Sequence, residues 1–209
     1  RGAGEVVAIG RRGADTLGLD ERLTSLGEAA NRLTVRACDV SDREQVTALI
    51  DSLSEGHPTL RGVFHAATVL DDALLTNLDD DRLEKVIAAK ARGAGHLHEA
   101  THDLSLDAFV LFSSVTTLLG NPGQGNYVAA NGYLDGLTSV RRAQGLAATC
   151  LNWGPIGDIG MLADNEAVKT GLEARLGAGI SGSLARYCVQ EHLRRHRGRA
   201  DAARRRLRH

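Results

Sequence analysis

Short apolar runs rich in Val, Ile, Leu and Phe alternate along this chain with stretches of helical periodicity. The runs predict strands at Glu5–Ile9, Leu33–Cys38, Gly62–Ala67, Ala108–Phe112 and Thr149–Trp153, with helices at about 20–30, 42–54, 79–102 and 124–145. Apolar strands separated by helices are typical of a parallel sheet that is covered on both faces. The pattern therefore predicts an α/β fold with a doubly wound parallel sheet. The amphipathic stretch at 158–177 is expected to form a flap over a ligand.

The net charge of −1 hides two unlike parts of the chain. Nine arginines lie between Ser181 and His209 beside only Glu191 and Asp201, whereas residues 1–180 carry 16 basic and 24 acidic side chains. We therefore divide the chain into a folded domain over residues 1–180 and an Arg-rich tail over residues 181–209. Residues 193–209 could be a solvated basic tail or the product of a shifted reading frame. Nucleic-acid binding would depend on this tail alone, so a nucleic-acid partner is not expected.

The sequence has no apolar stretch near the ~18 residues that cross a bilayer, and no charged-then-apolar leader, so we expect a cytoplasmic protein without a membrane partner. Cys38, Cys150 and Cys188 are odd in number and far apart. They are expected to be reduced thiols rather than a disulfide scaffold or a zinc cluster.

Polar residues follow three of the predicted strands, where open parallel sheets bind their ligands. Arg11 and Arg12 come after the first strand, Asp39 and Val40 after the second, and Ser114 after the fourth. A guanidinium can fork onto a ribose 2′-phosphate, and an acid can accept from an adenine amino group. The pattern favours NADP over NAD, with solvated loop arginines as the alternative.

The densest functional signal is the segment Phe109–Asp135. Ser114 ends a buried strand, and Tyr127 begins a helix with Asn131 one turn on, so the phenol and the amide are predicted to face the same cleft. Lys90 lies upstream in an otherwise apolar helix. We expect its ammonium to lower the pKa of the Tyr127 phenol and so to prepare a tyrosine acid.

These residues lie in sequence motifs that resemble those of the ketoreductase domains of modular (type I) polyketide synthases, within the short-chain dehydrogenase/reductase superfamily. The motifs are HAATVLDD (65–72), AAKARGAGHLHE (88–99), FVLFSSV (109–115), GNPGQGNYVAAN (120–131) and LNWGP (151–155). The resemblance implies a Rossmann-like fold. An ordinary short-chain dehydrogenase has lysine four residues after its tyrosine, whereas here Asn131 holds that position and Lys90 supplies the lysine, as in the polyketide subfamily.

The resemblance also implies an activity, NADPH-dependent reduction of a β-ketoacyl thioester on an acyl carrier protein, within a polypeptide that carries other polyketide synthase domains. Tyr127 would donate a proton to the keto oxygen, Ser114 would hydrogen-bond that oxygen, and Lys90 and Asn131 would support Tyr127. The implied cofactor-binding residues are Arg11, Arg12, Asp39, Val40, Ala66 and Ala67. The implied stereocontrol residues are Leu70, Asp71, Asp72, Pro122 and Asn126, which with Leu119 match B-type enzymes and a D-configured alcohol. Asp71 and Asp72 could instead merely cap a helix.

Three features depart from the family pattern. Thr68 stands where glycine is usual, and its β-branched side chain would crowd the nicotinamide. The family's first strand and its glycine-rich turn would precede residue 5, and its last strand would follow the flap. The sheet is therefore expected to lack the first strand and the last one. The alternative function is accordingly a catalytically impaired ketoreductase remnant with a structural or interaction role.

One competing motif is His98-Glu99-Ala100-Thr101-His102, an H-E-x-x-H sequence on a predicted helix. No third ligand follows at a convincing offset, and the same letters belong to the ketoreductase motif. We therefore expect no metal site.

Overall fold

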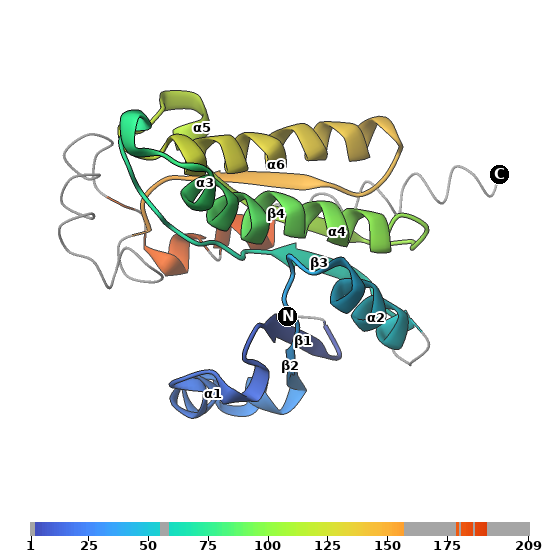
Figure 1. The fold of residues 1–209 in the computed structure, drawn as a ribbon. Helices are drawn as coiled ribbons and strands as arrows, with labels where there is room; N and C mark the ends of the chain where they lie inside the picture. The colour runs from blue at the N-terminus through green and yellow to red at the C-terminus, as the bar shows by residue number, and fades with distance from the viewer. Residues whose placement is uncertain (1–2, 55–58, 157–178, 180, 186, 192–209) are drawn as a thin grey trace.

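A computed structural model describes residues 3–54, 59–156, 179, 181–185 and 187–191 of the chain. Its strands are β1 (Val6–Gly10), β2 (Leu33–Ala37), β3 (Gly62–His65), β4 (Ala108–Ser114) and β5 (Thr149–Trp153). All their pairings are parallel, in one sheet of order β1-β2 and another of order β3-β4-β5. Helices pack beside these strands (Figure 1), which confirms the predicted Rossmann-like α/β class.

The α-helices are α1 (Leu19–Leu26), α2 (Arg43–Ser54), α3 (Asp80–Ile87), α4 (Gly93–Ala100), α5 (Thr116–Leu119) and α6 (Gly125–Ala143). Short 3-10 turns cover Gly13–Asp15, Gly27–Arg32 and Leu75–Asn77. The predicted helix at 79–102 begins as expected, because the Asp79 carboxylate accepts from the Arg82 backbone N–H at 2.9 Å. It is not one regular helix, however: a π-turn at Ala88–Arg92 joins α3 to α4.

The sheet is split between β1 and β3. Among the described residues no strand joins them, so β1 pairs only with β2, and β3 only with β4. Apolar side chains on these strands remain uncovered, since Val6 is 49% exposed and Phe64 is 53% exposed.

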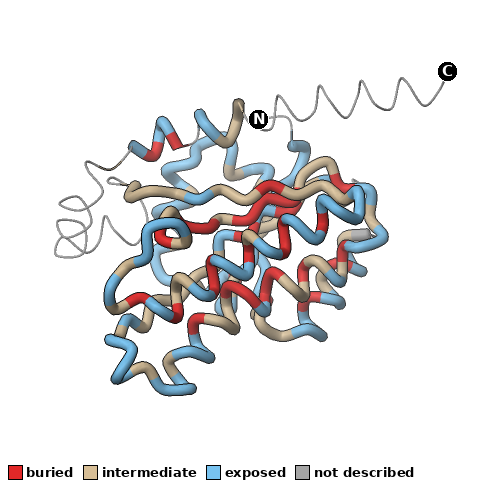
Figure 2. The backbone as a smooth tube through the Cα atoms, turned by 90° about the horizontal axis from the view of Figure 1, so that it is seen from above, coloured by how far each residue is buried: buried red, intermediate tan, exposed pale blue. Residues whose placement is uncertain are grey.

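Burial is concentrated around the second sheet. Phe109 and Leu111 of β4 pack with Leu134 of α6 and Leu97 of α4 in one apolar cluster, and Figure 2 shows buried positions along the adjoining strand and helices. Between residues 3 and 37, by contrast, Gly13 alone is buried.

Several predicted bounds are wrong by one to four residues. β1 begins and ends one residue later than predicted, and β3 ends at His65, so Ala66 and Ala67 lie in the loop that follows it. β4 continues through Ser114. The predicted flap at 158–177 and the stretch 193–209 lie outside the described residues.

Candidate active site

Ser114 is the last residue of β4, and it is buried. Its hydroxyl oxygen accepts two hydrogen bonds from Thr116, one from the backbone N–H at 3.2 Å and one from the side-chain hydroxyl at 2.9 Å. With the oxygen occupied as an acceptor, the Ser114 hydroxyl hydrogen is directed toward a third group.

Tyr127 lies in the first turn of α6. Asn126 fixes that turn, because its side-chain oxygen accepts from the Tyr127 backbone N–H at 2.8 Å. Burial raises the pKa of the Tyr127 phenol, and the Ser114 hydroxyl and the Asn131 amide offset this only in part. The expectation of a lowered phenol pKa is therefore wrong, since desolvation of the phenolate outweighs its neighbours.

Asn131 is completely buried one helical turn beyond Tyr127. Its side-chain N–H donates to the Tyr127 backbone carbonyl at 2.8 Å. Its side-chain oxygen is buried without a hydrogen-bond partner. A buried acceptor without a donor is unfavourable by roughly 1–3 kcal/mol, so this oxygen is a candidate contact for a water or a ligand.

Lys90 projects from the π-turn toward Tyr127 and the end of β4. Its ammonium donates to the Phe112 carbonyl at 2.9 Å and lies 5.5 Å from the centroid of the Tyr127 ring. Burial lowers the pKa of Lys90 to about 8. Ser114 at the end of β4, Tyr127 and Asn131 in α6, and Lys90 in the π-turn therefore lie close together, as the sequence predicted.

The predicted stereocontrol residues connect two loops. Asn126 donates to the Asp71 carbonyl at 2.8 Å, and Gln124 donates to the Asp72 carboxylate at 2.8 Å. The Asp71 carboxylate points elsewhere, to Arg82 at 2.6 Å and Lys85 at 3.2 Å. Asp71 therefore does not cap a helix with its carboxylate. Leu70 is half-buried and Pro122 is exposed.

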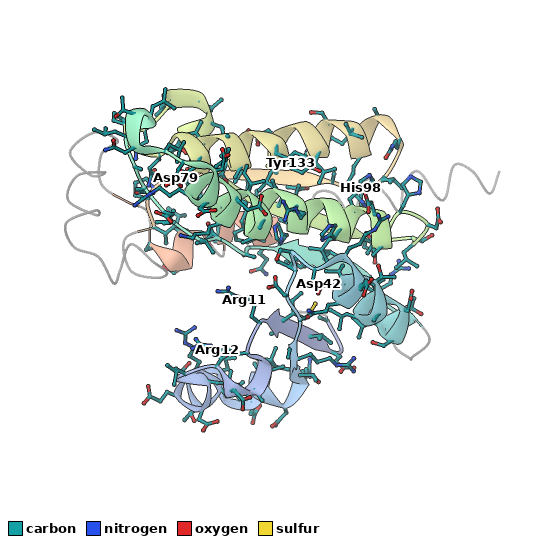
Figure 3. The ribbon with its side chains drawn as sticks, in the orientation of Figure 1. Arg11, Arg12, Asp42, Asp79, His98 and Tyr133 are labelled. Atoms are coloured by element: carbon teal, nitrogen blue, oxygen red, sulfur yellow. The ribbon has the colours of Figure 1, made fainter. Side chains whose placement is uncertain are left out.

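The residues predicted to bind a cofactor follow β1, β2 and β3. Arg11 and Arg12 are exposed beyond the tip of β1 (Figure 3). The Asp39 carboxylate accepts from the Ser41 hydroxyl at 2.6 Å, and this bond together with the charge of Arg11 lowers the pKa of Asp39. The Val40 carbonyl contacts a ring nitrogen of His96 at 3.2 Å. Ala66 is exposed and Ala67 is half-buried.

Two further buried polar atoms lie at strand ends. The Thr68 hydroxyl follows β3 and the Trp153 indole nitrogen ends β5, and neither has a hydrogen-bond partner. In register, Trp153 is the partner of Ser114. These orphaned groups support a ligand-binding edge of the sheet.

Sequence reasoning missed two residues that shape this site. His65 is 3% exposed at the end of β3, and its Nε2 lies 2.8 Å from the Lys90 carbonyl. Gln124 is buried and bonds Asp72. The available signal for His65 was a polar side chain inside the apolar strand GVFH.

The H-E-x-x-H side chains have other partners. A ring nitrogen of His98 accepts from the Arg141 guanidinium at 2.8 Å, Glu99 pairs with Arg43 at 3.1 Å, and His102 contacts Asp103. Within the described ranges no group of three or more His, Cys, Asp or Glu side chains could hold a metal ion.

Parallel strands flanked by helices, with a serine, a tyrosine, an asparagine and a lysine brought together at the strand ends, define a Rossmann-like protein of the short-chain dehydrogenase/reductase superfamily. Comparison with known proteins gives the family. The KR domain family matches residues 1–158. The chain belongs to the ketoreductase (KR) domain family of modular polyketide synthases.

Similar proteins agree with this membership. A phenolphthiocerol synthesis polyketide synthase of Mycobacterium bovis is 49% identical over 153 residues, which is 73% of this chain and 7% of that protein. A Mycobacterium tuberculosis relative whose name includes the word inactive is 48% identical over 153 residues, 73% of this chain and 10% of that protein. A solved structure of A-type ketoreductases from a modular polyketide synthase gives a TM-score of 0.86 at 40% identity, covering 93% of this chain and 40% of that chain.

The chain thus spans a small fraction of these curated relatives and about two fifths of that solved chain. Among the described residues no helix is both long and apolar enough to cross a membrane.

Proposed function

We propose that residues 1–180 carry the reduction of a β-ketoacyl thioester, presented by an acyl carrier protein, to the β-hydroxyacyl thioester with NADPH as cofactor. Other polyketide synthase domains would share the polypeptide in the cytoplasm. The Arg-rich tail over residues 181–209 would begin packed rather than separate, since Ala185 is 5% exposed. The observation that carries this proposal is the orphaned oxygen of Asn131, whose amide bonds the Tyr127 backbone, with the Lys90 ammonium 5.5 Å from the centroid of the Tyr127 ring.

Four side chains of the chain would have separate roles at the keto oxygen. Ser114 would donate its hydroxyl hydrogen to that oxygen and stabilise the developing negative charge. Tyr127 would donate the proton, which suits a phenol whose raised pKa keeps it protonated at neutral pH. Lys90 and the Asn131 oxygen would return a proton to Tyr127 through water.

The described residues fit the two ends of an NADPH molecule. Arg11 and Arg12 are exposed and could fork onto a 2′-phosphate. Asp39 and Val40 follow the neighbouring strand, and Ala66 and Ala67 precede Thr68, whose hydroxyl lacks a hydrogen-bond partner. When bound, NADPH supplies the hydride. Substituting both arginines with alanine should weaken binding of NADPH about tenfold and leave binding of NADH unchanged.

Turnover tests the proposal directly. The chain is mixed with NADPH and trans-1-decalone, and absorbance loss is followed. Tyr127→Phe should reduce the rate at least ~100-fold, because it removes the proton donor. Tyr133→Phe is the matched control, since Tyr133 is 45% exposed further along the same helix. Equal rates for wild type and Tyr127→Phe would overturn the assigned role.

We propose the B-type, D-configured product. The support is the bonding of Asn126 and Gln124 to the Asp71 and Asp72 loop, together with Leu119. The competing outcome is an A-type, L-configured product, because a solved structure of A-type ketoreductases is similar to this chain. Chiral chromatography of the alcohol decides, because an L-configured product would refute the B-type assignment.

The split between β1 and β3 favours a second candidate, an impaired remnant. Its test is to extend the chain upstream with a strand and a glycine-rich turn that can supply a helix N-terminus to a pyrophosphate. Turnover by the extended chain supports the reductase. Absence of turnover both in the chain and in a folded extended chain supports the structural role.

A further inference from the structure

His65 and Lys90 are linked by a buried hydrogen bond. His65 Nε2 lies 2.8 Å from the Lys90 carbonyl oxygen. A carbonyl can only accept, so Nε2 must carry the hydrogen. Burial lowers the pKa of His65 to about 4, which keeps the ring neutral at physiological pH. The bond therefore fixes one tautomer of His65, with the hydrogen on Nε2.

The acceptor of this bond belongs to the π-turn at Ala88–Arg92. The Gly93 N–H is shared between the Ala88 carbonyl, five residues back, and the Lys90 carbonyl. Such wide turns are rare and occur mostly as single turns, frequently at functional sites. Each residue of a regular helix turns the chain by about 100°, so the extra residue in the turn decides where the Lys90 side chain points.

Gly93 allows this turn to lie against β3. A Cβ on Gly93 would come within 2.8 Å of a Val40 methyl and 3.3 Å of His65 Cε1. The helix therefore approaches the strand ends closely at this position, and the histidine ring fills the space beside the glycine.

We propose that His65 is a positioning residue for Lys90: its Nε2–H holds the carbonyl of the π-turn, and this turn directs the Lys90 ammonium to the Phe112 carbonyl and the Tyr127 ring. The part that concerns catalysis rests on the proposed function. The part that concerns the placement of Lys90 does not.

The variants separate the hydrogen bond from the volume of the ring. His65→Gln keeps an N–H at a comparable reach, and His65→Leu removes it while filling a similar space. His96→Leu is the matched control. His96 lies in α4, directly after the π-turn, and its ring also contacts a backbone carbonyl, that of Val40, at 3.2 Å. Gly93→Ala keeps the histidine but crowds the turn, because the new Cβ would press on a Val40 methyl and on the His65 ring.

The first readout is the titration of Lys90, which needs no turnover. The chain has three lysines, so ¹³C-labelled lysine gives few NMR signals, and Lys90→Met assigns the one of interest. Lys90 should titrate near pH 8 in the wild type, in His65→Gln and in His96→Leu. In His65→Leu its pKa should rise by at least about one unit, because the ammonium moves toward water. An unchanged Lys90 titration in a folded His65→Leu protein would refute the proposal.

Two measurements keep the test decisive should His65→Leu not fold. Gly93→Ala should raise the Lys90 pKa in the same way, and an unchanged value there counts against the proposal. In the wild type, ¹⁵N shifts of His65 should show the hydrogen on Nε2. A hydrogen on Nδ1 instead would leave no donor for the Lys90 carbonyl and would overturn the proposal.

The second readout is the pH profile of kcat in whichever form of the chain turns over. His65→Leu should lower kcat about tenfold or more and move the limb of the profile that lies near pH 8, with a smaller change in KM and rescue in His65→Gln. Failure of the proposed function removes this readout but leaves the Lys90 titration intact, so the two failures are distinguishable.

Discussion

The ammonium of Lys90 lies 5.5 Å from the centroid of the Tyr127 ring, although the two residues come from different helices. A backbone carbonyl, that of Phe112, is its hydrogen-bond acceptor. Burying an ammonium against a carbonyl and a ring compensates only part of the lost hydration. Lys90 therefore lowers the stability of the fold at neutral pH.

Replacing Lys90 with methionine should raise the free energy of unfolding at pH 7 by about 1–2 kcal/mol. The pKa of Lys90 is about 8 when folded, below its unfolded value, so the unfolded state binds more protons between these two values. The wild type should accordingly gain stability as the pH rises from about 8 to about 10.5, and the advantage of the variant should shrink. Denaturant titrations at pH 7 and pH 10 measure this; an advantage independent of pH would contradict it.

Gly13 should tolerate alanine much less well than Gly18. Both have positive φ, +51° and +69°, but a Cβ on Gly13 would lie 2.6 Å from the Ala37 backbone nitrogen, whereas Gly18 faces open space. Gly18→Ala should destabilise by about 1 kcal/mol and Gly13→Ala by about 3 kcal/mol. Amide exchange of β1 and β2 measures the difference, and equal protection in both variants would argue against the close approach.

The side-chain carboxylate and the backbone carbonyl of Asp71 should have different effects on the stereochemistry of the product. Its carboxylate pairs with the half-buried Arg82 and the exposed Lys85, while its carbonyl accepts from the buried Asn126 amide. Asp71→Asn should therefore leave the configuration of the product unchanged, whereas Asn126→Leu should reduce both the rate and the enantiomeric purity. Chiral chromatography on the active form compares them, and loss of purity in Asp71→Asn alone would reverse the assignment.

Thiol reactivity should follow exposure and thiolate formation. Cys188 is exposed, and burial together with Asp135 raises the pKa of Cys150 to about 12. At pH 8 an alkylating reagent should label Cys188 first and leave Cys38 and Cys150 protected until unfolding. Peptide mass spectrometry against time tests the order, which early labelling of Cys150 would contradict.

The sequence predicted the fold class because strand cores such as that of Ala108–Ser114 are apolar and the strands are well separated. It extended β3 too far because Ala66 and Ala67 continue the apolar run, whereas pairing with β4 ends at the His65–Leu111 register position. Apolar character identifies a buried strand, but the end of its ladder depends on a neighbouring strand.

The candidate site was predictable where spacing alone decides. Positions 127 and 131 share a helix face. Ser114 was expected just after the strand Ala108–Phe112, and the structure extends this strand to include it. The π-turn was not predictable, because it depends on a contact between Lys90 and a residue 25 positions away in the sequence. The raised pKa of Tyr127 was missed for a related reason, since burial arises only when the whole site is assembled.

With Gly13 alone buried between residues 3 and 37, the β1, β2 and α1 portion has little packing of its own. It should open locally at a much lower free energy than β4 and α6, as a separate unit of exchange. An anion that binds Arg11 would then bind only molecules in which β1, β2 and α1 are folded. Its apparent affinity would be the intrinsic affinity reduced by the fraction of molecules in which the portion is closed, so that ligand affinity and local stability would rise and fall together.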